Sequence, residues 1–271
     1  FLYVLLMTPG VYLGDDYIYL YSVTINSILL LFSIIIFYKI VSSKSNTTYG
    51  VVGAALLGLN PVIWANTATG LETILVLLTF LLLWTAAESP RTKANTIGLL
   101  AISTVSVLAR VDGFIFPLIA AIYLLISKER KTAILLASYV VLLMAVYTLF
   151  RYNYYHDIIS NTYYAKVTGN ILERLVAGLD FVARNTISNA IAFYFIFTAL
   201  VLISPLVRRK PTYLSFPAVF FFIWTAYIIY IGGDVYYERL LLPLLAIGIY
   251  FFLSYLQIFN SKLVASFLLL L

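Results

Sequence analysis

The stretch IGLLAISTVSVLARVDGFIFPLIAAIYLLIS, residues 97–127, decides the fold, because it is apolar almost throughout yet contains an arginine and an aspartate near its middle. A bilayer core takes about 20 consecutive apolar residues as one helix, and a helix satisfies its own backbone hydrogen bonds there. Arg110 and Asp112 therefore divide this run into two helical spans, at about 97–109 and 114–127. The stretch predicts two membrane helices joined at a charged turn.

The rest of the chain continues this pattern. It is 63% hydrophobic and 10% charged, whereas about a quarter of the residues in a soluble domain are charged. The apolar runs are continuous rather than alternating, which disfavours a β-barrel. We therefore expect an all-α polytopic membrane protein with about nine transmembrane helices. Besides the two above, the spans are expected at about 18–38, 49–66, 73–87, 133–150, 189–206, 213–231 and 239–258, after a partial helix at 1–13 that breaks at Pro9-Gly10.

Charge alternates between the breaks that separate these spans. The breaks at 39–48, 88–96, 128–132, 207–212 and 259–262 hold 11 Lys and Arg and 2 acidic residues. The opposite breaks hold 6 Lys and Arg and 9 acidic residues. Because an excess of Lys and Arg in short loops marks the cytoplasmic side, the carboxylates are predicted to lie on the outer face.

The overall charge and the ends of the chain carry further expectations. The net charge of +6 comes from short loops between spans, so nucleic acid is not an expected partner. The absence of cysteine excludes a disulfide framework and a thiolate metal site. Because the chain starts without Met and ends inside an apolar run, we expect residues 1–271 to be one transmembrane domain truncated at both ends.

Residues 170–187 are predicted to form an amphipathic helix. Leucines and valines recur there at helical spacing, and the charged side chains fall largely on another face. Such a helix can lie along the outer membrane interface, or it can pack on the helical bundle by the same pattern. Both interpretations stay open at this point.

Glu72 ends the first of the outer-face motifs, TGLET at 69–73. Thr69 and Glu72 have the spacing of a capping box, in which the glutamate reaches back to the start of a helix. This structural interpretation is compatible with a functional one.

Arg110 and Asp112 belong to the second motif, ARVDG at 109–113. Ionisable groups at membrane depth usually face a partner or a water-filled cavity. Asp112-Gly113 can also be a tight turn between two helices. An arginine two residues from the aspartate suggests an anionic ligand such as phosphate, which guanidinium binds through two hydrogen bonds.

The third motif, NTYYAK at 161–166, lies in a tyrosine-rich polar segment. Its tyrosines can form an interfacial aromatic belt, while Tyr163 and Tyr164 can also stack on a sugar. Asn161 and Lys166 supply hydrogen-bond donors for hydroxyls or phosphate. His156 is the single histidine of the chain, so no histidine cluster supports a zinc site.

Two further acidic groups complete the outer face. Asp234 follows Gly232-Gly233 and precedes Arg239, as either a charged site or a glycine turn with a charge pair at the membrane end. Asp15 and Asp16 are a candidate pair for catalysis or for a divalent cation such as Mg²⁺ or Mn²⁺. Adjacent carboxylates before a helix are also favourable N-terminal charges, and we favour that interpretation.

At these motifs the chain resembles the GT-C superfamily of integral-membrane glycosyltransferases, in particular the branch of terminal arabinofuranosyltransferases and related mannosyltransferase-like proteins. The similar segments read Thr69-Gly-Leu-Glu-Thr73, Arg110-Val-Asp-Gly113, Ser160-Asn-Thr-Tyr-Tyr-Ala-Lys166 and Gly232-Gly-Asp234 through Arg239-Leu-Leu-Leu-Pro243. They occur in the family's order and cover about 60–245. Ser160 stands where the family has proline.

The resemblance implies transfer of a sugar from a polyprenyl-phosphate-linked donor to a glycan, lipid or protein acceptor at the outer face of a prokaryotic plasma membrane. Glu72, Arg110, Asp112, Asn161, Tyr163, Tyr164, Lys166, Asp234 and Arg239 are the implied donor-binding residues. The family's catalytic carboxylate would lie upstream of Phe1, with Asp112, Asp15 and Asp16 as the alternatives within the chain. No cofactor is required, although a divalent cation fits. A transporter or flippase for a lipid-linked or acidic solute is the alternative function.

Overall fold

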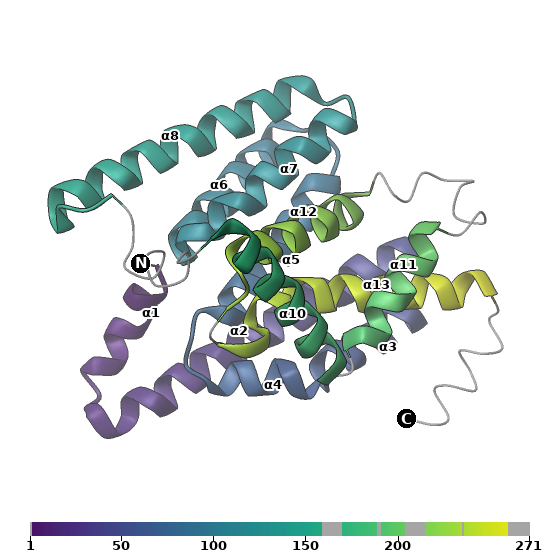
Figure 1. Cartoon of the computed structure of the whole chain (residues 1–271), viewed down its shortest axis with the longest axis horizontal. Helices are drawn as coiled ribbons and strands as arrows, with labels where there is room; N and C mark the ends of the chain where they lie inside the picture. Colours follow the sequence, from purple (N-terminus) through teal and green to yellow (C-terminus); the bar gives the residue numbers. More distant parts are fainter. Residues whose placement is uncertain (1, 159–169, 189–190, 204–214, 235, 260–271) are drawn as a thin grey trace.

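A computed structural model of the chain describes residues 2–158, 170–188, 191–203, 215–234 and 236–259, and these residues form an all-helical fold (Figure 1). The α-helices are α1 (Leu2–Val11), α2 (Asp15–Lys44), α3 (Thr47–Gly58), α4 (Pro61–Ala68), α5 (Thr73–Glu88), α6 (Lys93–Ala109), α7 (Ile115–Ile126), α8 (Arg130–Tyr155), α10 (Ile171–Ser188), α11 (Ile191–Ile203), α12 (Phe216–Ile231) and α13 (Leu242–Phe259). Two 3₁₀ helices, η1 (Val111–Phe114) and η4 (Tyr237–Leu241), precede α7 and α13.

The number of helices able to span a membrane is smaller than the sequence predicts. Within the described residues three helices are long and apolar enough, namely most of α2, α8 and the helix over Glu238–Gln257. The pair α3 and α4 would make a fourth span, bent by 50°. The expected count of nine is not supported, because five further apolar helices have only 10–17 residues, against the roughly 20 that a bilayer core requires.

Two helix breaks differ from the prediction. Helix α1 continues through Pro9 to Val11 instead of breaking at Pro9-Gly10. The span expected at 49–66 is divided at Asn60, whose side-chain oxygen accepts a hydrogen bond from the backbone N–H of Val62. Pro61 then occupies the first turn of α4, where a missing N–H costs nothing.

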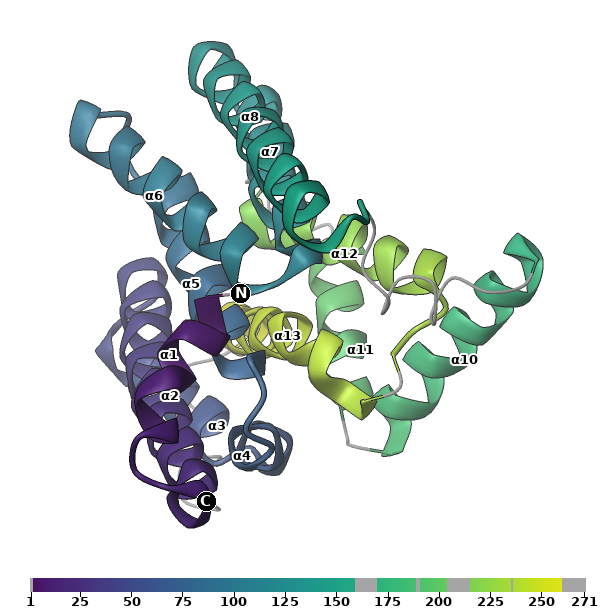
Figure 2. The same ribbon diagram turned by 90° about the vertical axis from the view of Figure 1, so that its left-hand side faces the viewer.

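Helices α5 and α13 form the centre of the fold, and α2 and α8 lie at its edges (Figure 2). The core contains an aromatic cluster in which Phe80 of α5 lies 4.4 Å from Phe220 of α12, measured between ring centroids. Trp224 of α12 packs edge-on against Phe116 of α7, with centroids 4.7 Å apart. These rings join α5, α7 and α12 into the unit that carries the charged residues.

Charged side chains gather at the two ends of α5. At one end Glu88 pairs with Lys44 and accepts hydrogen bonds from the Trp84 indole and the backbone N–H of Phe216. Glu72 lies at the other end. The 16 residues of α5 separate the two glutamates by about 24 Å, so groups that the charge pattern assigns to opposite faces lie at opposite ends of the helix.

Helix α10 forms where an amphipathic helix is predicted, and it packs on the bundle, while its position at a membrane interface stays a prediction. One face packs on α12, where Gly178 lies against the backbone of Ile229. Leu172, Val176 and Leu179 form a separate apolar edge that is exposed. The helix therefore packs on the bundle and also presents apolar surface outward.

Candidate functional site

The turn that carries Glu72 is attached to α2 by a buried asparagine. The Asn26 side-chain amide donates hydrogen bonds to the backbone oxygens of Thr67 and Leu71, each 3.2 Å away. Gly70 has a left-handed backbone, with φ of +69°, a conformation that glycine adopts without steric cost. The predicted capping box does not form, because the Thr69 hydroxyl donates to the Asn66 carbonyl and Glu72 makes no side-chain cap hydrogen bond. The Glu72 side chain is directed elsewhere.

Arg110 and Asp112 meet because α6 ends abruptly at Ala109. Arg110 is extended, η1 follows at once, and the Ser106 hydroxyl donates to the Gly113 carbonyl at 2.8 Å. Arg110 Nε and Nη2 then donate to the two oxygens of Asp112, both at 2.8 Å. The tight turn expected at Asp112-Gly113 is therefore present and also pairs Arg110 with Asp112, whereas the expected anionic ligand stays a prediction.

Asp234 and Arg239 make an equivalent pair between α12 and α13. Gly232 and Gly233 both have positive φ, +84° and +86°, which turns the chain back toward the bundle. Arg239 Nε donates to Asp234 Oδ2 at 2.7 Å and Nη2 donates to Oδ1 at 3.1 Å. The Trp224 indole N–H donates to the Leu240 carbonyl at 2.8 Å and fixes η4, and with it Arg239, on the core.

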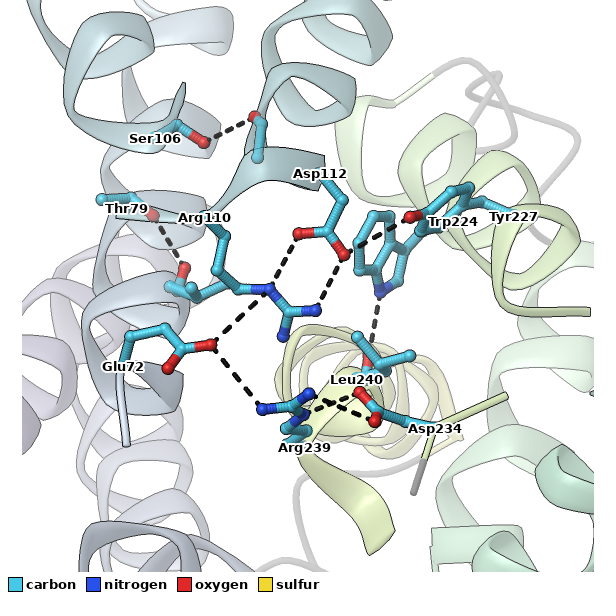
Figure 3. Close-up of polar contacts among 12 residues, drawn as sticks. Glu72, Thr79, Ser106, Arg110, Asp112, Trp224, Tyr227, Asp234, Arg239 and Leu240 are labelled. Carbon is cyan, nitrogen blue, oxygen red and sulfur yellow. Dashed lines mark hydrogen bonds and ion pairs between the residues drawn. The ribbon is translucent and has the colours of Figure 1, made fainter. Parts of the chain in front are cut away.

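Glu72 joins the two pairs into one cluster (Figure 3). Its Oε1 lies 3.8 Å from Arg110 Nε and 3.7 Å from Arg239 Nη1. Burial favours the neutral form of Arg110, but Asp112 and Glu72 outweigh it, so the pKa of Arg110 is raised above its ordinary value. With all five groups ionised, three carboxylates and two guanidinium groups give the cluster a formal charge of −1.

The three carboxylates differ in how fully they are engaged. Asp234 has a side-chain exposure of 0%, and Asp112 one of 17%. Both accept two hydrogen bonds from an arginine, and Asp112 also accepts one from the Tyr227 hydroxyl at 3.4 Å. Glu72, at 21%, is the most exposed, and within the described residues its carboxylate accepts no hydrogen bond. Glu72 is therefore the carboxylate most available to accept a proton from a bound molecule.

The other predicted site residues are not brought into this cluster. Asn161, Tyr163, Tyr164 and Lys166 lie outside the described residues. Asp15 and Asp16 begin α2, but their side chains are not described. His156 ends α8 in a left-handed conformation, with φ of +55°. No group of three or more His, Cys, Asp or Glu side chains in the described part of the chain is arranged to hold a metal ion.

Sequence reasoning missed two residues that shape the site. Asn26 is a polar residue inside an apolar span, a pattern that indicates a buried partner. Tyr227 lies in a continuous apolar run, FPAVFFFIWTAYIIYI, and nothing in that run distinguishes it from the neighbouring aromatic residues.

The cluster is recessed from the ends of the two longest helices. Asn26 lies level with Leu71, and the 11 residues of α2 before it extend about 16 Å farther along the axis. On α8, Tyr139 lies level with Thr104 of α6, and the 16 residues after it extend about 24 Å. Helix α6 ends five residues after Thr104, directly before Arg110 of the cluster. Helix α8 therefore extends about 16 Å beyond the cluster.

The described residues thus form an all-helical fold with several long apolar helices, compatible with an integral membrane protein, and with a partly buried ionic cluster at one end of its core. Comparison of the chain with models of protein families, with curated proteins and with solved structures gave no match. A function for the protein therefore has to be inferred from the chemistry of the cluster itself.

Proposed function

We propose that the protein is an integral-membrane glycosyltransferase that moves a sugar from a polyprenyl-phosphate-linked donor to an acceptor hydroxyl. The observation that carries the proposal is the convergence of three separate motifs on one recessed cluster, in which one carboxylate accepts no hydrogen bond from the described residues. These three motifs are among the four segments on which the resemblance to GT-C enzymes rests. A lipid-linked donor suits a recessed site between long apolar helices, because it approaches sideways from the bilayer.

In the proposed reaction Glu72 is the general base. It takes the proton of the acceptor hydroxyl while the oxygen attacks the anomeric carbon of the sugar. The bond from that carbon to the phosphate oxygen breaks, and polyprenyl phosphate leaves with the electron pair. Arg110 and Arg239 hold Glu72 in place from two sides, while Asp112 and Asp234 fix the two arginines. Lys166 is the proposed cation for the leaving phosphate.

The proposal is tested by a transfer assay in proteoliposomes, with polyprenyl-phosphate sugars as donors and the full protein. Transfer is expected in the unmodified protein and is expected to be lost in Arg110→Ala, Asp112→Asn and Lys166→Ala. Normal transfer in all three variants would show that the site is wrongly assigned, and absence of transfer with every donor tried would refute the activity.

Two helix interruptions favour the alternative of a transporter. Helices α3 and α4 form a bent pair with a 50° break, and α6 gives way to η1 at Arg110. Interrupted helices near charged groups are typical of transporter binding sites. Uptake of a polyprenyl-phosphate sugar into proteoliposomes, without any change in the sugar linkage, would select this function over transfer.

A further inference from the structure

The ionic cluster has little capacity left for a phosphate group. Asp112 fills the hydrogen-bonding fork of Arg110, and Asp234 fills that of Arg239. The formal charge of −1 would repel an incoming anion. A phosphate bound beside this cluster therefore needs a cation that no carboxylate among the described residues already neutralises.

Arg174 is such a cation. Its Nε and Nη1 are buried and have no hydrogen-bond partner in the described part of the chain. The guanidinium lies over the ring of Tyr230, with Cζ 5.4 Å from the centroid. The ring offers no oxygen acceptor, so this contact leaves the Nε and Nη1 donors of Arg174 unsatisfied within the described residues. A buried donor without an acceptor is costly, which points to an acceptor from outside the chain.

The carboxylates of α10 are engaged elsewhere. Glu173 accepts a hydrogen bond from the backbone N–H of Asn170 at 3.3 Å, and the Asn170 side chain accepts one from Leu172 N–H at 3.2 Å. These contacts form a capping box at the start of the helix. Asp180 pairs with Arg184 at 2.6 Å. Neither acid neutralises Arg174.

Arg174 also lies next to the loop that carries Asp234. A Cβ atom built on Gly232 would be 3.5 Å from the carbonyl oxygen of Arg174, and Asp234 follows two residues later. Tyr230, which stacks on Arg174, is three residues from Tyr227, which donates to Asp112, so the two rings lie on adjoining parts of α12. The arginine is thus beside the cluster but outside its ion pairs.

We infer that Arg174, whose guanidinium lies over the ring of Tyr230, is a phosphate-binding residue that holds the phosphate of the lipid-linked ligand beside Glu72. The inference rests on the proposed function for the identity of the molecule that carries the phosphate. The fork of N–H donors suits phosphate oxygens, which accept two parallel hydrogen bonds from one guanidinium.

The test is the thermal melting of the detergent-purified full chain with a short-chain polyprenyl phosphate, with inorganic phosphate, and with the matching polyprenol. Polyprenyl phosphate is expected to raise the Tm of the unmodified protein, and the polyprenol is not. Inorganic phosphate distinguishes a site for a free anion from a site for a lipid-borne phosphate. Only a site for a free anion is expected to show a rise in Tm with inorganic phosphate. Arg174→Leu is expected to weaken phosphate binding by at least about tenfold.

Arg184→Ala is the matched control, since Arg184 is on the same helix and its side chain is 79% exposed. It is expected to retain the ligand-induced rise in Tm. Without ligand, Arg174→Leu is expected to melt at the same temperature as the unmodified protein or higher, because it removes two buried N–H groups that lack an acceptor among the described residues. A purely structural arginine would lower that temperature.

Three outcomes would overturn the inference. They are an undiminished rise in Tm in Arg174→Leu, a ligand-free Tm in that variant well below that of the unmodified protein, and no response of the unmodified protein to either phosphate. Arg174-dependent binding without sugar transfer would refute the proposed function alone. Transfer with an unchanged KM in Arg174→Leu would refute this inference alone.

Discussion

At the scale of single residues, the environment of Glu72 allows its role to be tested independently of the other carboxylates of the cluster. It lies 3.8 Å and 3.7 Å from two arginines, distances beyond hydrogen bonding. Glu72→Gln keeps the side-chain size and removes the proton acceptor. If Glu72 is the base, kcat for sugar transfer should fall by about 10²- to 10⁴-fold, while the Tm in detergent changes little.

Asp234→Asn is the matched control for that prediction. Asp234 is fully buried and accepts two hydrogen bonds from Arg239, so its loss should lower the Tm as well as the activity. Unchanged kcat in Glu72→Gln would exclude Glu72 as the base and return the role to another carboxylate.

The Arg110–Asp112 pair permits a second prediction about residues. Removing one partner of a buried pair leaves the other uncompensated and costs about 3–5 kcal/mol, whereas replacing both with apolar groups is often neutral. Arg110→Leu should therefore lower the Tm more than the double variant Arg110→Leu/Asp112→Leu does. A double-mutant cycle on thermal unfolding measures the coupling. Additive effects would mean that the 2.8 Å contacts contribute little to stability.

At the scale of elements, the junction of α6 and η1 depends on Gly113. A Cβ atom at this position would overlap the carbonyl oxygen of Ser106. Gly113→Ala should force the junction open, reduce stability by about 1–3 kcal/mol and separate Arg110 from Asp112. The Tm and the transfer rate should both fall.

Gly98→Ala in α6 provides the control, because a Cβ atom at Gly98 meets nothing within 4 Å. This change should be neutral or slightly stabilising, since alanine favours a helix over glycine by about 1 kcal/mol. If both variants melt at the same temperature, the close contact at Gly113 does not constrain the junction.

Apolar runs predict some of these elements better than local capping motifs do. The helices expected at 73–87 and 97–109 form as Thr73–Glu88 and Lys93–Ala109, because charged and polar residues bound each run. The capping box expected at Thr69 is absent, whereas Asn170 and Glu173 form one. Capping residues have several possible partners, and the tertiary environment decides among them: two arginines distant in the sequence attract Glu72.

At the scale of the whole molecule, the charge pattern predicts that Glu72, Arg110, Asp112, Asp234 and Arg239 share one face, and the structure brings them into contact. The pairing of each arginine with a particular carboxylate is not predictable from the sequence, because it depends on how α6, α12 and η4 pack. The predicted number of nine spans is not supported for a related reason. Hydropathy reports that a segment is apolar, but many of these helices are buried among other helices and are shorter than a bilayer crossing.

The orientation of the whole molecule gives the last prediction. Helix α8 has 26 residues, about 39 Å, which exceeds the hydrocarbon core of about 30 Å. The basic segment at 128–131 includes the first two residues of α8, and the positive-inside rule places this segment in the cytoplasm. Because the chain has no cysteine, single cysteines report sidedness without a background signal. Tyr154→Cys should react with a membrane-impermeant maleimide in intact cells, and Lys128→Cys only after permeabilisation.

Val111→Cys lies between the two charged residues of the α6–η1 junction and is exposed, so it should label from the same side as Tyr154→Cys. Labelling of Tyr154→Cys and Lys128→Cys from one side would mean that α8 does not cross the membrane. A full reversal would place the ionic cluster on the cytoplasmic face, where the donor would have to be presented from inside the cell. The expected pattern would leave Glu72 and both arginines facing a lipid-linked donor from the outer leaflet.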